Sequence, residues 1–127
     1  MIRRTHSGSP FESAYGFSRA LRVGDSLRVA GTAPIPPNGE EVAPTAGEQM
    51  TRCATIAKAA LRDLAPAWTV IRTRMYITDP DDADEIGRAH AAAFGADDPV
   101  ATMVVVAALL DPAWRVEIEV EAIADPI

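Results

Sequence analysis

The chain has 127 residues, which is enough for one domain with a hydrophobic core and too few for two. Twelve basic and eighteen acidic residues give it a formal net charge of −6. Proteins that bind nucleic acids draw most of their affinity from cationic contacts to phosphates, so we expect no nucleic-acid partner. No apolar run approaches the roughly 20 residues that span a bilayer, so we expect no membrane partner either.

The remaining composition is typical of a cytoplasmic globular protein with a single domain over residues 1–127. Hydrophobic residues make up 48% of the chain. The first eight residues include arginines but no apolar stretch behind them, unlike a secretory signal. Cys53 is the only cysteine, which excludes an internal disulfide and suits a reducing compartment. Because nothing near it in sequence supplies a base, we expect Cys53 to be a packed thiol.

The first half of the chain predicts a hairpin followed by a helix. Alternating residues at 17–23 and 27–29 flank the Gly24-Asp25 pair, a pattern typical of an antiparallel hairpin. Residues 33–39 are rich in proline and predict a surface loop. Thr45 and Glu48 have the spacing of a capping box at a helix start, and Pro66 should end that helix. Its apolar face is expected to contain Met50, Ala54, Ala57, Leu61 and Leu64.

The second half predicts a strand, a helix and two further strands. Residues 68–78 are expected to form a strand with Ile71, Thr73, Met75 and Ile77 on one face, and Arg72, Arg74 and Tyr76 on the other. The helix should begin at Asp79-Pro80 or at Asp82 and run to about Phe94. Its buried side is predicted to comprise Ile86, Ala89, Ala93 and Phe94. Residues 101–110 are uniformly apolar, which predicts a strand covered on both faces. Residues 116–123 alternate and should form the last strand.

This order of elements predicts an α+β fold, a two-layer sandwich in which two helices cover one face of a sheet. The helix-free face would then expose apolar side chains, which invites association. A closed ring of identical subunits would bury such a face. We therefore expect an oligomer.

Three glutamates, Glu117, Glu119 and Glu121, share one face of the last predicted strand at a spacing of roughly 6.6 Å. Arg72 and Arg74 have the same two-residue spacing on another strand. One interpretation is a structural or inter-subunit ion-pair ladder. The other is that one glutamate lines a pocket as a general base or positions a water molecule. The pattern leaves both open.

Metal binding and nucleophilic catalysis find little support in the sequence. His6 and His90 are the only histidines and lack the spacing of a metal site, and we expect His90 at the surface or edge of its helix. No glycine-rich phosphate loop and no nucleophile elbow is present. We expect neither a metal nor a cofactor.

Several segments resemble, in order over about residues 15–124, the Rid family, also called YjgF or reactive-intermediate deaminase. Residues 15–20 (YGFSRA) are similar to its G-P-Y-S-x-A opening, and residues 29–34 (VAGTAP) to its S-G-x-x-P segment. Residues 48–50 (EQM), 75–79 (MYITD) and 99–104 (PVATMV) stand where the family has E-Q-T, its third strand and P-A-R-x-x-V. Residues 119–124 (EVEAIA) are similar to its E-I-E-A-I-A ending.

The resemblance implies a chorismate-mutase-like fold with a mixed sheet, a homotrimer, and three inter-subunit clefts for a small-molecule ligand. Studied members hydrolyse enamines or imines to a ketoacid and ammonia. In them an arginine grips the substrate carboxylate, a glutamate at the position of Glu119 is thought to position the attacking water, and an aromatic ring at the position of Phe17 covers the pocket. The candidate catalytic residue is therefore Glu119. The candidate substrate-binding residues are Phe17, Ala30, Gly31, Arg74, Gly87, Ala101 and Thr102.

The chain departs from the family pattern at informative positions. Ala101 stands at the arginine position, Phe17 lacks the tyrosine hydroxyl, Ala30 replaces a small hydroxyl residue, and Gly87 replaces an asparagine. Losing one charge-assisted clamp costs roughly 1.5–3 kcal/mol, or one to two powers of ten in affinity. We therefore do not expect efficient standard imine hydrolysis.

Two functions remain open. In the first, the chain is a divergent Rid enzyme acting on a C–N bond, in which Arg74 or Arg19 replaces the missing cation. In the second, it is a non-catalytic trimer that binds a metabolite or a protein in its cleft.

Overall fold

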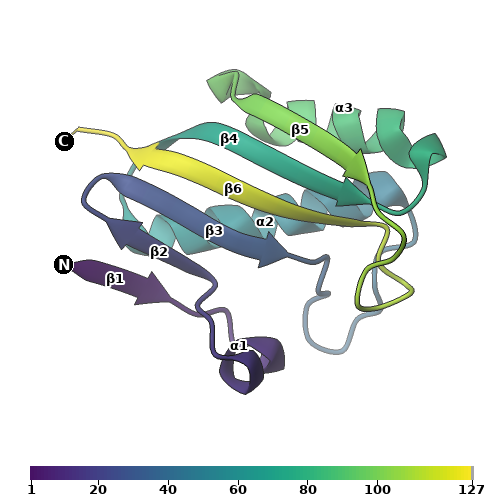
Figure 1. Ribbon diagram of the computed structural model, residues 1–127, viewed down its shortest axis with the longest axis horizontal. Helices are drawn as coiled ribbons and strands as arrows, with labels where there is room; N and C mark the ends of the chain where they lie inside the picture. The colour runs from purple at the N-terminus through teal and green to yellow at the C-terminus, as the bar shows by residue number, and fades with distance from the viewer. Residues whose placement is uncertain (127) are drawn as a thin grey trace.

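A computed structural model describes residues 1–126 and has the expected architecture: a two-layer α+β sandwich with one mixed six-stranded sheet. The long helices α2 and α3 cover one face of the sheet, and neither of them reaches the opposite face, which is called the helix-free face below (Figure 1). The strand order is β1-β2-β3-β6-β4-β5, with β4 and β5 parallel and every other pair antiparallel. The elements are β1 (Ile2–Thr5), α1 (Pro10–Tyr15), β2 (Ala20–Val23), β3 (Ser26–Thr32), α2 (Ala46–Leu64), β4 (Trp68–Ile77), η1 (Pro80–Asp82), α3 (Ala83–Phe94), η2 (Gly95–Asp97), β5 (Val100–Val105) and β6 (Val116–Ala124).

The predicted hairpin and first helix are confirmed. Strands β2 and β3 pair around the turn at Gly24, whose positive φ of 60° suits glycine. The Thr45 hydroxyl accepts a hydrogen bond from the Glu48 amide at 3.2 Å and caps α2. The helix ends at Leu64, two residues before Pro66. All five predicted apolar residues of this helix are buried against the sheet.

The second helix begins at the later of its two predicted starts. Residues 80–82 form a separate 3-10 turn, and α3 follows with Asp82 at its N-cap position. Its core residues are Ile86 and Phe94, which are almost fully buried, while Ala89 and Ala93 pack against the core partly exposed. The predicted buried side of this helix is therefore confirmed.

One residue of strand β4, Ile71, was predicted on the wrong face. Thr73, Met75 and Ile77 are buried as expected, but Ile71 is 43% exposed, and Val70 takes the core position instead. The cause is an irregularity in the pairing of β4 with β6 between Val70 and Arg72, which shifts the side-chain alternation by one residue. A bulge of this kind leaves no signature in the hydrophobic pattern.

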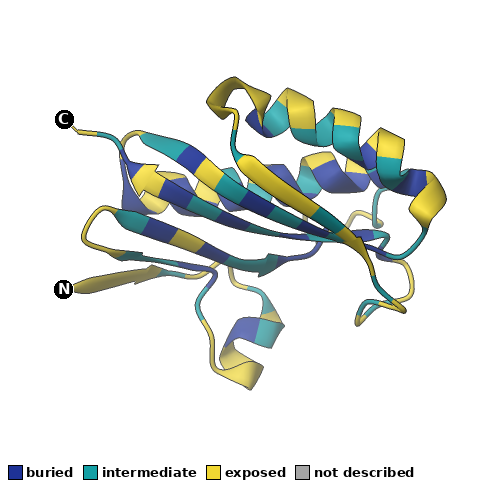
Figure 2. Cartoon of the chain, turned by 45° about the horizontal axis from the view of Figure 1, so that its top comes forward, coloured by how far each residue is buried: buried dark blue, intermediate teal, exposed yellow. Residues whose placement is uncertain are grey.

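The strand predicted over residues 101–110 is confirmed only as far as Val105, and its predicted cover on both faces was wrong. Strand β5 spans only Val100–Val105, lies at the edge of the sheet beside β4, and is exposed at five of its six positions (Figure 2). The apolar composition indicates a covered strand, but a single chain supplies no cover for this edge. Val100 is 59% and Val104 is 41% exposed. A run this apolar at an open edge invites contact with another surface.

Two N-terminal elements were not predicted, namely edge strand β1 and the short helix α1. Strand β1 pairs with β2, and Arg3 donates to the carbonyls of Asp63 and Leu64 at the C-terminal end of α2. Arg22 on β2 donates to the same Leu64 carbonyl at 2.9 Å. Cations at this position satisfy carbonyls that the helix itself leaves free.

Among residues 1–126, no helix is long and apolar enough to cross a membrane.

Candidate functional site

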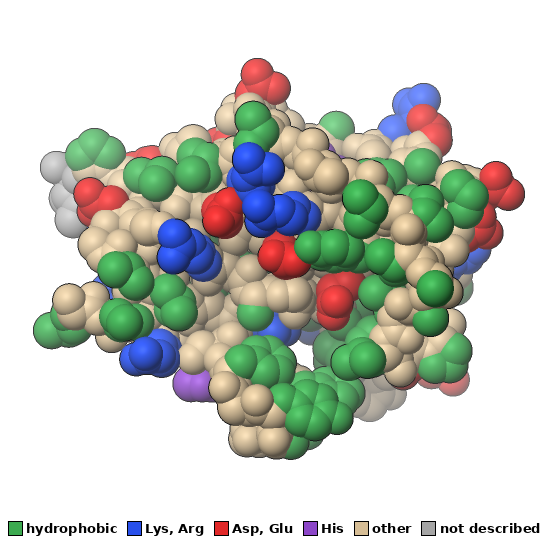
Figure 3. Space-filling view, in the orientation of Figure 1, with side chains coloured by type: hydrophobic (Ala, Val, Ile, Leu, Met, Phe, Trp, Pro, Cys, Tyr) green, Lys and Arg blue, Asp and Glu red, His purple; other side chains and the backbone are tan. Residues whose placement is uncertain are grey.

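Acidic and basic side chains alternate across the middle of the helix-free face. Arg28 on β3, Arg72 and Arg74 on β4 all approach Glu121 on β6, at 3.9, 3.4 and 3.9 Å. Arg74 also lies 3.9 Å from Glu119. Figure 3 shows these blue and red groups side by side on the sheet, with apolar patches around them. The ladder predicted from the two-residue spacings therefore forms within one chain.

Glu119 has the most defined surroundings of the three glutamates. Its Oε1 accepts a hydrogen bond from the Tyr76 hydroxyl, and its Oε2 faces the Arg74 guanidinium. The bond to Glu119 raises the pKa of Tyr76, so the phenol stays protonated and acts as donor. The Glu119 side chain is nevertheless 38% exposed. It is an oriented carboxylate that a ligand or water molecule on this face can reach.

Glu117 lies apart from the ladder, at a small cavity of about 80 Å³ between α1 and the sheet. The cavity wall is aromatic, with Phe11, Tyr15, Phe17 and Trp114, and its polar members include Arg19 and Glu117. Phe11 packs edge-on against Trp114 with ring centroids 6.2 Å apart.

Gly31 is in van der Waals contact with the Glu117 carboxylate at this cavity, and a side chain at position 31 would still have room. A methyl group added at Gly31 would lie 3.5 Å from the Glu117 carboxyl carbon. Burial is the largest cause of a raised pKa at Glu117, with Glu119 adding to it and Arg19 opposing it. Two carboxylates two residues apart on β6 thus have different environments. Such a difference is what acid and base roles require.

Arg19 connects α1 to the sheet and is buried. Its guanidinium donates to the Gly31 carbonyl at 2.9 Å and lies 3.7 Å from the Glu12 carboxylate. It also packs on the Phe17 ring, 5.4 Å from the centroid. Its Nε has no hydrogen-bond partner among the described residues. Burial lowers the pKa of Arg19, whereas Glu12 and Glu117 raise it.

The predicted site residues fall into three groups. Phe17 and Gly31 line the aromatic cavity with Glu117, and Ala30 lies beside Phe17 in a larger hollow next to α1. Glu119, Arg74 and Thr102 form a row across β6, β4 and β5, since Arg74 is the register partner of both others.

The third group lies away from the helix-free face. Ala101 is the register partner of Thr73, whose buried hydroxyl bonds His90 beneath α3 at 2.7 Å. Gly87 is on α3 itself, in the helix layer. One chain therefore does not bring Ala101 and Gly87 to the other candidates.

The comparison with known protein families accords with this fold. The family described as Endoribonuclease L-PSP matches residues 8–124. The chain belongs to this family. Among its members, an uncharacterized Streptomyces coelicolor protein, SCO2049, is 36% identical over 126 residues, covering 95% of this chain and 91% of that protein. The RutC family protein y4sK of Sinorhizobium fredii is 36% identical over 108 residues, covering 81% and 82%.

A solved structure supports the same assignment. Rv2704 from Mycobacterium tuberculosis, described as a member of the YjgF/YER057c/UK114 family, has a TM-score of 0.82 and 39% sequence identity. The match covers 98% of this chain and all of the other. The resemblance to the Rid, or YjgF-type, family is therefore confirmed, and so is the chorismate-mutase-like fold class.

Some residues of this family member's site were not recognisable from sequence. Tyr76 was placed on the correct face of its strand, but nothing indicated its bond to Glu119. Arg4, His6 and Ser18 line the hollow beside α1, yet β1 was not predicted at all. Glu117 has the same alternation as its neighbours, so only its place at the aromatic cavity sets it apart.

Two further residues complete the comparison with the sequence predictions. Cys53 is fully buried, and burial raises the pKa of its thiol far above the ordinary range. His90, which was expected at the surface or edge of its helix, is half-buried, because its ring packs 5.5 Å from Phe94 and bonds Thr73. Residues 1–126 contain no group of three potential metal-ligating side chains.

Proposed function

We propose that three copies of this chain assemble with their helix-free faces inward and form clefts at the subunit boundaries. The support is the apolar surface that a single chain leaves open. Ile71, Val100, Val104 and Ile123 are each between 39% and 59% exposed, and all lie on the sheet. Burying apolar surface stabilises by roughly 25 cal/mol per Å², so covering these side chains with identical subunits is favourable.

Each cleft is proposed to bind a small molecule and to hydrolyse an enamine- or imine-type C–N bond. The observation that supports this proposal most directly is that the Arg74 guanidinium lies 3.9 Å from the Glu119 carboxylate. Glu119 accepts a proton from water as the water oxygen bonds to the imine carbon. The protonated Glu119 carboxyl gives that proton to the nitrogen, which completes the carbinolamine. The hydroxyl proton of the carbinolamine then passes to the nitrogen as the C–N bond breaks and the C=O bond forms, which releases ammonia and a carbonyl product. A carboxylate held by Tyr76 and Arg74 is pre-oriented for this proton transfer.

Ala101 limits the reaction. The Rid arginine that grips a substrate carboxylate is absent, so small amino-acid-derived imines are expected to be poor substrates. Arg74 is committed to two glutamates, and Arg19 is buried against Glu12. The substrate is therefore expected to differ from that of the studied family members.

The word endoribonuclease in the family description does not carry over to this chain in our proposal. RNA cleavage requires a surface that attracts phosphates. The formal charge is −6, and the arginines at the centre of the helix-free face are paired with Glu119 and Glu121. No cofactor and no metal are invoked.

The test is ammonia release from a panel of small imines and enamines. Wild-type protein is expected to turn over at least one compound, and Glu119→Gln is expected to abolish this turnover. Glu121→Gln is the matched control, because it removes the same charge from the same strand face two residues away. Turnover that survives Glu119→Gln would remove Glu119 from the mechanism.

A non-catalytic binding protein is the second candidate, and the replacement of the arginine by Ala101 favours it. It predicts saturable ligand binding without ammonia release from any compound of the panel. Mass spectrometry of ligands retained through purification would identify what the cleft holds.

A further inference from the structure

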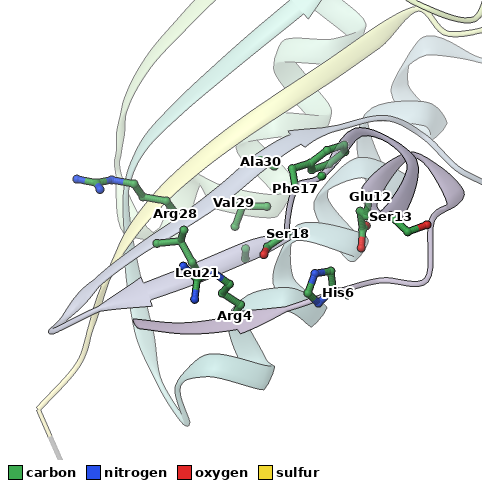
Figure 4. A pocket seen from close by; sticks show the side chains of 12 residues that line it. Arg4, His6, Glu12, Ser13, Phe17, Ser18, Leu21, Arg28, Val29 and Ala30 are labelled. Carbon is green, nitrogen blue, oxygen red and sulfur yellow. The ribbon is translucent and has the colours of Figure 1, made fainter. Parts of the chain in front are cut away.

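A second feature of the helix-free face is a hollow of about 590 Å³ between α1 and strands β1, β2 and β3. Its lining includes three basic side chains, Arg4, His6 and Arg28, together with Ser18 (Figure 4). We propose that this hollow binds the oxyanion of a small ligand, a carboxylate or phosphate, between Arg4 and Arg28. The proposal rests on the small-molecule cleft proposed above and names the chemical class that the cleft recognises.

The sheet register places the two arginines around a common neighbour. Leu21 on β2 is the register partner of both Arg4 on β1 and Arg28 on β3. Directly opposite residues share a face, so all three side chains emerge on the same side. Neighbouring strands lie about 4.8 Å apart, which separates the two arginine backbones by roughly 10 Å. Two long side chains at that separation can both reach one oxyanion above Leu21.

The charges around the hollow are unusual for this acidic chain. Every other lysine and arginine has a carboxylate, carbonyl or aromatic partner, but Arg4 has none within residues 1–126. Arg28 has only Glu121, at 3.9 Å, which it shares with two further arginines. An anion between Arg4 and Arg28 would relieve the repulsion between like charges. Arginine also provides paired donors that match a carboxylate or phosphate.

The one carboxylate in the lining does not compete for this position. Glu12 is 3% exposed, accepts hydrogen bonds from the Ser7 amide and hydroxyl, and faces Arg19. Its charge is therefore already balanced by Arg19, which follows α1, and by Ser7 in the preceding loop. The excess positive charge of the hollow stays with Arg4 and Arg28.

The hollow shares Phe17 with the aromatic cavity of Glu117. Phe17 and Ala30, two of the candidate substrate-binding residues, are part of its lining. A ligand whose anion lies between Arg4 and Arg28 would place its organic part against the Phe17 ring. The two arginines would then do at the opposite end of the ligand what the missing arginine at position 101 does in the studied relatives.

The test is calorimetric titration at low ionic strength with two probes, pyruvate and inorganic phosphate, because exposed charge contacts are screened by salt. Wild-type protein is expected to bind at least one of them saturably. Arg4→Gln/Arg28→Gln should weaken that binding about tenfold or more. Arg88→Gln is the matched control. It removes the same charge from the outer side of α3, where Arg88 pairs with Asp84 at 2.8 Å. Preference for one probe assigns the oxyanion as carboxylate or phosphate.

Several results would overturn the proposal. The first is that wild-type protein binds neither probe. The second is that the double variant binds the probe with the same affinity as wild-type protein. The third is that Arg88→Gln loses as much affinity as the double variant. Arg4→Gln alone is the safeguard against misfolding, because Arg4 has no intrachain partner to lose. Probe binding without imine turnover would retract the enzymatic proposal and keep this one. If Arg4→Gln breaks the assembly and wild-type protein binds no anion, Arg4 serves the subunit interface instead.

Discussion

Replacing Arg19 by methionine tests whether the buried pair of Arg19 and Glu12 holds α1 on the sheet. Methionine keeps most of the volume of the side chain and removes the charge. The Glu12 side chain, 2% exposed, would lose its cation, and the Gly31 carbonyl would lose its donor. Phe17 would lose the guanidinium that packs on its ring. The same three contacts position the wall of the aromatic cavity.

The magnitude follows from the geometry. At the observed 3.7 Å, the attraction is about 4.5 kcal/mol at an effective dielectric constant of about 20. Removing one partner of a buried pair typically costs about 3–5 kcal/mol, since the other charge stays buried. We expect a loss in this range for Arg19→Met. The double variant Glu12→Gln/Arg19→Met should recover more than half of it, because no unpaired charge remains.

Urea unfolding of the single and double variants provides the measurement, with Arg62→Met as an exposed control. Arg62 lies on the outer side of α2, where its only aromatic contact is a ring 6.0 Å away, so its loss should cost about 0.5 kcal/mol or less. A loss below 1 kcal/mol for Arg19→Met would refute the reasoning. A double variant less stable than Arg19→Met would do the same.

Three further predictions concern single titratable groups. Burial raises the pKa of Glu117, so this residue stabilises the fold at low pH, and that stabilisation is lost as pH rises through the folded-state pKa. Denaturation curves taken at pH 4–8 should therefore show a smaller fall in stability for Glu117→Gln than for wild-type protein. Burial lowers the pKa of His90, so the unfolded chain takes up the proton first, and stability falls as pH drops below 6.5. His90→Gln, which can keep the bond to Thr73, should show a shallower fall, and a parallel curve would contradict the assignment. Cys53 should react with a thiol reagent only at the rate of unfolding, since its side chain is inaccessible and its pKa is raised; rapid labelling of the native protein would disprove the packing described above.

The two long helices, α2 and α3, and the last strand could be predicted from sequence because their side-chain patterns are regular. The capping residue Thr45 and the apolar stripe of α2 act through neighbours three and four residues apart, so local order suffices. Strand β6 alternates without interruption. The two layers follow from these elements alone.

The failures within the sheet arise from interactions between distant segments. Ile71 was assigned to the wrong face because a bulge against β6 is a property of the pair of strands. Residues 101–110 were predicted to form a covered strand because their apolar composition indicates that they are buried. Composition does not indicate whether the same chain or another molecule buries them. Strand β1 is four residues long and is stabilised by β2 and by the end of α2, neither of which its own sequence reveals.

For the candidate site, the sequence predicted only which side chains share a face of the sheet. The ladder of Glu119 and Glu121 with Arg74 follows from matched spacings on two strands. The separation of Glu117 from that ladder reflects its place at the aromatic cavity, whose wall comes from α1 and from Trp114, far apart in the sequence. The basic hollow depends on Arg4, on a strand that sequence periodicity did not detect.

The central claim is that identical subunits cover the helix-free face and the edge of β5. Sedimentation equilibrium at micromolar concentration tests it directly. The account predicts a single species of about 40 kDa, three times the chain mass of 13.5 kDa. A folded species of 13.5 kDa at that concentration would contradict it.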